Sequence, residues 1–521
     1  MRSLSFGVFV VLMCVLTFAG VLIGDGNLIL AILPVAATAT LYAMWRLPLR
    51  YPVLILTFLA LTLENPSDAP ASGLWRSPLY GVGALMLAHM NLTFTQSKWM
   101  LFSGLDLALV YLFGVALTRW LLGLRTDQVG RVEGASPMRF FAAVCLGGAV
   151  WMWVWGMVRG DADVASSLWQ MQRVIYLPVV FFLFHLALRG EADRAALGKV
   201  ILGAACVKAV VAIYVHATVA PPPNEPVLPY ATTHSDSMLF ACAFCLVVTL
   251  ILERLDRRRA LLGLLVLPLL AAGMVANHRR VAWVEIAAGL ATLYALTPMT
   301  RAKRGLARVA VLALPFALVY VAVGWGSTSA LFGPVGVIRS VVDSQADGST
   351  AWRDWENYNL FYTLRQSPLL GTGYGHGYIE LVKLPDISQA YSLYRFIPHN
   401  SILSLWAYGG FVGFTALWSM LVVGVYFAAR AARHARRPAD RTAAITATGA
   451  VVVYLVQCYG DMGLGTWTSV FTVAPALAVA SQLAVVTGAW AAVARPARGR
   501  PVIFVSAVPT TPSSSPSAEA S

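Results

Sequence analysis

The sequence predicts an all-α membrane protein that crosses the bilayer many times. Of its 521 residues, 58% are hydrophobic and 12% are charged, and the mean hydropathy is +0.70. A soluble globular chain is about 45–50% apolar and about 25% charged, so this chain has too few ionic groups to solvate several soluble domains. Inside a bilayer every backbone amide must be paired within the protein, and for apolar runs of this length an α-helix does so. The composition also excludes disordered, collagen-like and disulfide-stapled chains.

Apolar runs that suit membrane helices follow one another along the chain. A spanning helix needs about 20 mostly apolar residues to cross a hydrocarbon core about 30 Å thick. The runs lie near residues 4–24, 28–45, 51–63, 79–95, 103–118, 140–158, 174–188, 197–219, 237–252, 260–276, 281–297, 309–325, 401–429, 442–459 and 468–492. The run at 79–95 is interrupted by His89 and Asn91, and we interpret it as a segment that enters the membrane without crossing. We therefore expect about 14 transmembrane helices, within a range of about 12–15.

The distribution of Lys and Arg predicts the orientation. If the N-terminus is cytoplasmic and 79–95 does not cross, most of the 38 Lys and Arg fall in cytoplasmic segments, as membrane proteins prefer. Both termini are then cytoplasmic, and the long segment 326–398 lies on the opposite side. The net charge of +14 reflects this topology and contact with anionic membrane lipids, so we expect no nucleic-acid partner.

The chain divides into four regions on this reading. We expect an N-terminal transmembrane bundle over residues 1–229 and a core over 230–429 that contains the outward loop 326–398. C-terminal transmembrane helices follow over 430–494. The tail 495–521 is rich in Pro, Ser and Ala, a composition typical of disorder.

The outward loop is too long for a simple connector, since loops beyond about 12–15 residues are usually functional or disordered. It is rich in Trp, Tyr and Phe, which can bury area and stack on sugars, and its stretch 351–366 has the apolar spacing of a helix lying at the membrane interface. The glycine-rich stretch 367–378 lacks the preceding strand of a dinucleotide site. We instead expect its glycines, Gly371 and Gly373 among them, to permit tight turns and a close approach to another segment or to a ligand.

His399 is the candidate catalytic residue. Pro398 precedes it, and Asn400 or Ser401 can cap the helix that follows, which places the imidazole at a helix N-terminus on the outer surface. The positive end of the helix dipole disfavours the imidazolium and leaves a neutral ring that can accept a proton. The alternative is an interfacial histidine hydrogen-bonded to the loop.

Adjacent arginines mark a second candidate site. Arg279 and Arg280 lie in a very short turn within 276–286, on the same side as the outward loop and against the orientation rule. Charges at membrane depth cost several kcal/mol unless paired, and guanidinium groups suit phosphate oxygens. Contact with phospholipid headgroups or a salt bridge to Glu285 are the alternatives.

Further polar residues need weighing. Arg353 is a third candidate phosphate ligand, and Arg173 a fourth that fits an ordinary interfacial anchor. Lys208 lies inside a span without an evident partner. Asp161 and Asp163 fit a solvated loop, and the C-x-x-C pair 242–245 lies in an apolar span and fits packing, so we expect no metal site.

The order of three segments resembles the O-antigen ligase and polymerase family. These are W-R-x-x-W at 352–355, SPLLGTGYGHGY at 367–378 and PHNSILSLWAYGGFVGF at 398–414, in which Gly410 and Gly413 form the G-x-x-G pair. The turn NHRR is similar to the family's Ser-Arg element, although the serine is absent here. The resemblance covers roughly residues 230–420.

The resemblance implies a membrane glycosyltransferase of the bacterial inner (cytoplasmic) membrane with its active site facing the periplasm. It would transfer a glycan from an undecaprenyl-pyrophosphate carrier to a hydroxyl acceptor, a glycan or a lipid, with inversion and with no metal or cofactor. Carried onto this chain, His399 would be the general base, and Arg353 with Arg280 or Arg279 would bind the pyrophosphate; of these two we favour Arg280.

Three acceptor types and one other class of protein stay open. A polymerase joins two carrier-linked repeats, a ligase transfers to lipid A-core, and a third kind, the protein O-oligosaccharyltransferases, glycosylates proteins. A lipid-linked glycan flippase or other transporter is the alternative class. Transporters place functional charges within their spans, whereas the polar residues of this chain gather in an outward loop.

Overall fold

The computed structural model describes residues 2–23, 28–64, 79–89, 102–122, 137–219, 231–253, 257–299, 301–327, 329–332, 335–336, 338–339, 348–388, 391–461 and 463–490. Over these residues the chain is helical and forms no β-sheet, as the composition predicts. The predicted disordered tail 495–521 lies outside the described residues.

The helices follow the apolar runs closely. They are α1 (Arg2–Ile23), α2 (Leu28–Arg46), α3 (Arg50–Thr62), α4 (Tyr80–Leu87), α6 (Gly104–Leu121), α7 (Met138–Val158), α8 (Val164–Ala187), α9 (Glu191–Thr218), α10 (His234–Leu252), α11 (Arg257–Asn277), α12 (Val281–Leu296), α13 (Arg301–Gly324), the short 3₁₀ helix η3 (Ala330–Phe332), α15 (Gly348–Gln366), α16 (Ser401–His434), α17 (Pro438–Gly460) and α18 (Trp467–Val486). The helix predicted over 351–366 is α15, which begins three residues earlier than the apolar spacing indicated.

Within the described residues, nine helices are long and apolar enough to cross a membrane, and four shorter apolar helices accompany them. These features make the chain a multi-pass membrane protein, while the total of 14 crossings stays a prediction. Helix α4 has eight residues, about 12 Å of rise, so it cannot cross a core about 30 Å thick by itself. Residues 90–95 of the same apolar run lie outside the described residues.

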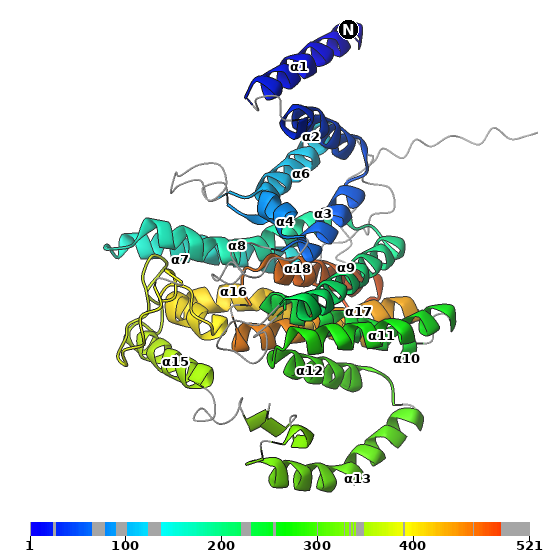
Figure 1. Cartoon of the computed structure of the whole chain (residues 1–521), viewed down its shortest axis with the longest axis vertical. Helices are drawn as coiled ribbons and strands as arrows, with labels where there is room; N and C mark the ends of the chain where they lie inside the picture. Colours follow the sequence, from blue (N-terminus) through cyan, green and yellow to red (C-terminus); the bar gives the residue numbers. More distant parts are fainter. Residues whose placement is uncertain are drawn as a thin grey trace, which may run out of the picture.

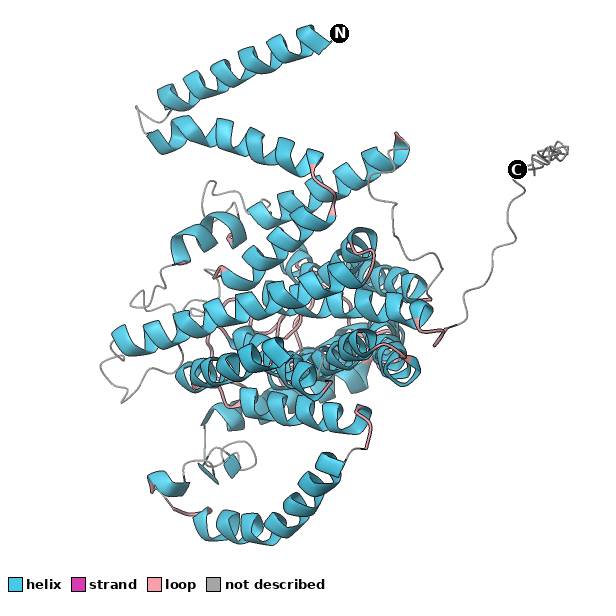
Figure 2. Ribbon diagram, turned by 90° about the vertical axis from the view of Figure 1, so that its right-hand side faces the viewer, coloured by secondary structure: helices cyan, strands magenta, loops and turns pink. Residues whose placement is uncertain are grey.

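A central bundle contains α7 to α12 and α16 to α18, while the α1–α2 pair and α13 lie at its margins (Figures 1 and 2). Helix α18 is the most enclosed, because it packs against α8, α16 and α17. Of its apolar window 89% is buried, whereas none of the window of α13 is. Large apolar side chains on the outer surface of the bundle suit contact with lipid chains, since a bilayer does not penalise them.

Short polar side chains begin several of the helices. Asn400 caps α16, where its Oδ1 accepts a hydrogen bond from the Leu403 amide at 3.0 Å, which confirms one of the two predicted caps. Asp163 caps α8 by accepting from the amides of residues 165 and 166. The carboxylate of Asp163, expected to be a solvated loop group, therefore satisfies the amides at a helix start.

Lys208 has partners that the sequence did not reveal, so the expectation of an isolated span lysine is wrong. Its Nζ lies 3.1 Å from Asp236 Oδ2 and 3.8 Å from Glu64 Oε1, and all three side chains are buried. The cluster joins the end of α3, the middle of α9 and the start of α10. A buried charge of this kind is tolerated because opposite charges compensate it, and removing one partner of such a group typically costs about 3–5 kcal/mol.

Helix α16 is broken at Gly410, whose backbone (φ 56°, ψ −161°) adopts a conformation open almost only to glycine. The break frees the carbonyls of residues 407 and 408 and the amides of 411 and 412. Two loop amides, at 372 and 373, donate to the freed carbonyls at 3.2 and 2.8 Å, and the freed amides donate to the carbonyls of 368 and 369 at 2.8 and 3.1 Å. The four bonds satisfy backbone groups that could not stay unpaired inside a membrane.

The glycine-rich stretch makes the close approaches that its sequence predicts. Gly371, Gly373 and Gly375 all have positive φ, where residues with a Cβ are strained. A Cβ on Gly371 would clash with the backbone of the broken turn of α16, and one on Gly373 would clash with Gly156 in α7. The prediction of a tight turn that packs against other chain segments is confirmed.

Replacing Gly410 by alanine is expected to destabilise the protein. The added Cβ would occupy a disallowed backbone conformation and would overlap the backbone of residues 369 and 371, so we expect a cost of about 2 kcal/mol or more. Thermal unfolding of the purified full chain measures this as a lower midpoint. Gly449→Ala is the matched control, because Gly449 lies inside α17 with open space around its Cα and should lose nothing. Equal midpoints for the two variants would contradict this account of the break.

Candidate functional site

A buried carboxylate holds the candidate catalytic histidine. Glu356 in α15 is 1% exposed and accepts a hydrogen bond from the backbone amide of His399 at 3.0 Å. The same carboxylate lies 3.2 and 3.3 Å from Nδ1 of the imidazole. Since a carboxylate can only accept, Nδ1 carries the hydrogen of this contact, and in a neutral imidazole Nε2 is then the nitrogen that can accept a proton. The side chain of His399 is 26% exposed, so part of the ring is open to the surroundings.

Two sets of contacts place α15 so that Glu356 meets His399. At one end, Nδ2 of Asn400 donates to Oδ1 of Asn357 at 3.0 Å, next to the Glu356–His399 pair. At the other end, the residues just after α15 bond to the broken turn of α16. The first part of α16 and α15 therefore run side by side in the same direction. Between them lies a small apolar cluster of Leu360, Leu364, Tyr378, Leu384 and Ala407, with Trp352 and Leu403 against it.

A second acid–imidazole pair lies close to the first. His234, the first residue of α10, makes an ion-pair contact through Nδ1 with the carboxylate of Asp461, which directly follows α17. The Asp461 carbonyl accepts a hydrogen bond from the Ser401 hydroxyl at 3.4 Å. Because Ser401 is two residues from His399, these contacts bring the starts of α10 and α16 and the end of α17 together.

Positive charge surrounds Asp461. Burial by itself opposes ionisation of this carboxyl, but its contact with His234, the nearby charge of Arg353 and, when its ring is protonated, His399 hold its pKa well below the usual range. The charges of Arg279 and Arg353 act in turn on His234. The turn between α11 and α12, the helix α15 and the start of α16 therefore contribute to one electrostatic cluster.

The structure thus gathers most of the residues that the sequence singled out. Arg353 and Arg279 are half-buried beside His234, and His399 lies near enough to Asp461 to act on it. Arg280 occupies the residue before α12 and is also half-buried. Of these two adjacent arginines, Arg279 is the one whose charge is shown to act on His234, and the preference for Arg280 as the pyrophosphate ligand stays a prediction.

Other predicted residues lie at the edge of this group. Pro398 lines a small cavity together with Arg173 and Ser401, so Arg173 contacts the site from the α8 side. Gly371 and Gly373 lie farther along the loop and shape it through the contacts with α7 and α16 described above. The alternative salt bridge between the arginines and Glu285 is not formed, because neither Glu285 oxygen has a hydrogen-bond partner among the described residues and no ion pair joins them there.

Sequence reasoning missed Glu356, His234 and Asp461. Glu356 is three residues after Arg353, so the two share one face of the helix, and this spacing was the available signal. His234 and Asp461 begin and follow apolar spans, as many solvated residues do. The local sequence does not show that His234 and Asp461 meet, because they are 227 residues apart in the chain.

The arrangement has a definite chemical capacity. It offers a proton acceptor held by a buried acid and, around it, guanidinium groups that can neutralise a charged oxygen group. Among the described residues no cluster of three or more His, Cys, Asp or Glu has the arrangement of a metal site. A reaction that needs a base and a stabilised anionic leaving group suits these residues.

Comparison with known proteins gives one match. Residues 265–418 match the family described as O-antigen ligase. The matched region runs from α11 into α16 and includes both arginines of the turn, Arg353, Glu356 and His399. His234 and Asp461 lie outside it. No curated protein matches the chain.

Asp461→Asn is expected to lower stability in a pH-dependent way. The carboxyl has a lower pKa in the folded than in the unfolded chain, so it stabilises the fold above the unfolded value of about 3.9, and that contribution is lost as pH falls below it. We expect a cost of about 1–3 kcal/mol at pH 5 to 7 and a smaller difference from wild type below about pH 4. Thermal unfolding of both proteins from pH 3 to 7 measures it. A difference that grows on acidification would have the wrong sign for this assignment.

Proposed function

Because residues 265–418 of this membrane protein belong to the O-antigen ligase family, we propose that the chain transfers a glycan from an undecaprenyl-pyrophosphate carrier to a hydroxyl acceptor. The observation that carries the proposal is the Glu356-held imidazole of His399 inside the same charged group as Arg353 and Arg279. The imidazole would activate the acceptor hydroxyl, and the two arginines would stabilise the leaving pyrophosphate.

The acceptor half of the reaction is assigned to His399. Its Nε2 takes the proton from the acceptor hydroxyl while the hydroxyl oxygen forms a bond to the anomeric carbon of the donor sugar. Glu356 acts as a positioning residue, because its hydrogen bonds to the Nδ1 side and to the backbone fix the ring and its tautomer. A positioned base of this kind typically contributes about 10²–10⁴-fold to the rate.

The leaving-group half is assigned to the arginines. As the bond between the anomeric carbon and the pyrophosphate oxygen breaks, the electron pair stays on that oxygen and negative charge grows on the pyrophosphate. Arg353 and Arg279, with Arg280 beside them, would stabilise this charge. Asp461 attracts Arg353 and so helps to hold its guanidinium in place. A single displacement from the opposite face inverts the anomeric centre.

We also propose that the site faces the periplasm of the bacterial inner membrane. The distribution of Lys and Arg along the chain supports this orientation. On the membrane face opposite the site, charged pairs such as Arg194–Asp440 and Arg441–Glu253 connect the helix ends. Carrier-linked glycan would then reach His399 from the outer leaflet.

The acceptor decides between three activities within the proposal. Transfer to a second carrier-linked glycan makes the chain a polymerase, transfer to lipid A-core makes it a ligase, and transfer to a protein side chain makes it a protein O-oligosaccharyltransferase. Offering each acceptor separately to the purified full chain, with one carrier-linked donor, identifies which is used. Lys208 does not support the alternative of a transporter, because Asp236 and Glu64 compensate its charge within the protein.

Removing the base or its support should cost activity to different degrees. We expect His399→Ala to lower the transfer rate by about 10²–10⁴-fold. We expect Glu356→Gln to lose less, about 10–100-fold, because the ring remains but its tautomer is no longer enforced. The measurement is glycan transfer from a carrier-linked donor by purified protein. His434→Ala, at the exposed far end of α16, is the control that should keep full activity. Undiminished transfer by folded His399→Ala protein would overturn the assignment of the base.

Removing a leaving-group arginine should also lower the rate. We expect Arg353→Ala to lose about 10²–10³-fold, because one preorganised charge donor is removed. Arg365→Ala, on the same helix but stacked on the exposed ring of Phe361, should retain activity. Because arginines neutralise the pyrophosphate in this proposal, EDTA should leave the wild-type rate unchanged. A rate abolished by EDTA and restored by Mg²⁺ would contradict it.

A further inference from the structure

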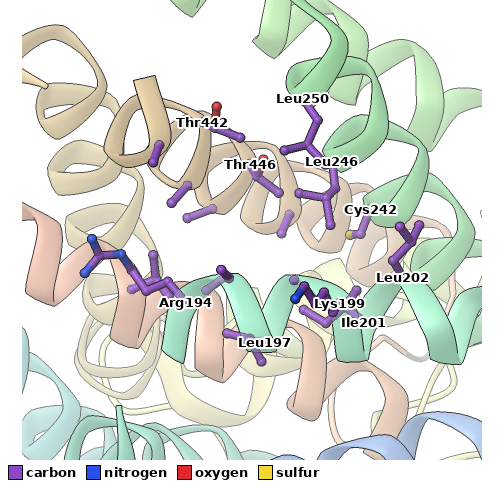
Figure 3. Close-up of a pocket in the computed structure, with 18 of the residues that line it drawn as sticks. Arg194, Leu197, Lys199, Ile201, Leu202, Cys242, Leu246, Leu250, Thr442 and Thr446 are labelled. Atoms are coloured by element: carbon purple, nitrogen blue, oxygen red, sulfur yellow. The ribbon is translucent and has the colours of Figure 1, made fainter. Parts of the chain in front are cut away.

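A large apolar cavity lies at the end of the bundle opposite the candidate site. It lies between α9, α10, α17 and α18 (Figure 3) and has a volume of about 270 Å³. It lies beside Leu250 near the end of α10 and Thr442 near the start of α17, whereas the candidate site lies at the start of α10 and the end of α17. The cavity is therefore separate from the proposed glycosyl-transfer site, and this inference does not depend on that function.

Most of the cavity wall is aliphatic. Leu197 and Val479 line it together with several alanines, and Figure 3 shows Leu202, Leu246 and Leu250 among the lining side chains. One water molecule needs only about 10–15 Å³, and large cavities with apolar walls do not fill stably with water. The occupant that best satisfies such a wall is a hydrocarbon chain.

Two threonine side chains, Thr442 and Thr446, line this apolar space. The hydroxyls of Thr442 and Thr446, one helical turn apart on α17, are buried and make no hydrogen bond with any described residue. A buried donor that lacks a partner costs about 1–3 kcal/mol, so these two hydroxyls require acceptors from outside the protein. Carbonyl oxygens at the head of a hydrocarbon chain would provide them.

Of the charged side chains that line the cavity, Lys199 has no ion-pair partner among the described residues. Arg194 is paired with Asp440, and Glu191 faces Arg437 at 3.7 Å. Lys199 is exposed at the cavity wall, and the structure shows no hydrogen bond or ion pair for it among the described residues. An anionic group next to the hydrocarbon chain would complement this ammonium.

We infer that the cavity binds one anionic glycerophospholipid of the leaflet opposite the candidate site. An acyl chain lies between α10 and α17, the ester carbonyls accept from Thr442 and Thr446, and the phosphate pairs with Lys199. Basic pockets between transmembrane helices bind anionic headgroups in this way. The lipid joins α9 and α10 to α17 and α18, and two of these helices end in the His234–Asp461 pair.

The test uses the purified full chain with phosphatidylglycerol and, separately, with phosphatidylcholine of the same acyl chains. Native mass spectrometry counts the retained lipids, and thermal unfolding measures stabilisation. We expect one retained phosphatidylglycerol per chain and about fivefold weaker retention of phosphatidylcholine, the preference that one lysine provides. Inorganic phosphate alone should give no stabilisation, because it cannot fill the apolar wall.

Three variants separate the parts of the site. Lys199→Gln should abolish the preference for phosphatidylglycerol, Thr446→Val should weaken retention of both lipids, and Ala447→Phe should fill the cavity and prevent retention. Lys383→Gln removes the same charge from the exposed loop after α15 and should behave as wild type. Equal retention of both lipids by wild type, an unchanged preference in Lys199→Gln, or stabilisation by inorganic phosphate equal to that by phosphatidylglycerol would each overturn the inference. Lys199→Gln and Thr446→Val alter only unpaired groups, so the test stands even if Ala447→Phe does not fold.

Discussion

The interruption of α16 at Gly410 is the feature on which the rest of the site depends. A membrane helix that breaks must satisfy the backbone groups that it frees, and here four hydrogen bonds from the stretch 368–373 do so. The same four bonds fix the end of α15 against α16. With that end fixed, Glu356 falls next to His399 about three turns away. A break in one helix therefore decides where a carboxylate on another helix is placed.

Electrostatic compensation explains how so many charges share a small volume. The group contains the acids Glu356 and Asp461, the imidazoles of His399 and His234, and the guanidinium groups of Arg353 and Arg279. Each acid contacts an imidazole, and the guanidinium groups of Arg353 and Arg279 lie in the same cluster. Guanidinium N–H groups match the oxygens of a diphosphate in geometry and charge, so a diphosphate is the kind of ligand that these two groups favour.

The two ends of the bundle show different relations between polarity and burial. At the site end, the buried acids Glu356 and Asp461 are each paired with an imidazole, and these pairs join α10, α15, α16 and α17. At the far end, an apolar cavity contains hydroxyls without partners and a lysine at its wall. Paired groups at the first end hold the protein's own side chains in position, whereas unsatisfied groups at the second call for a molecule from the membrane. The same helices thus contribute to the proposed reactive centre and to the proposed lipid site without the two overlapping.

The sequence by itself determined the helical membrane class, the positions of most helices and the cap at Asn400. It also identified His399, Arg353 and the adjacent arginines as candidate site residues. These follow from local properties: apolar length, the residue before a helix, and charges at membrane depth, each of which is visible within one segment. Only the tertiary structure decided that Glu356 supports His399, that Asp461 joins His234, and that Lys208 is paired. The partners in these contacts are far apart in the sequence. Glu356 and His399 are 43 residues apart, Lys208 and Asp236 are 28 apart, and His234 and Asp461 are 227 apart. The local sequence around an acidic residue is the same whether its carboxylate faces water or a cation. Which of the two it faces depends on the segments that pack against it, and these are set by the tertiary structure.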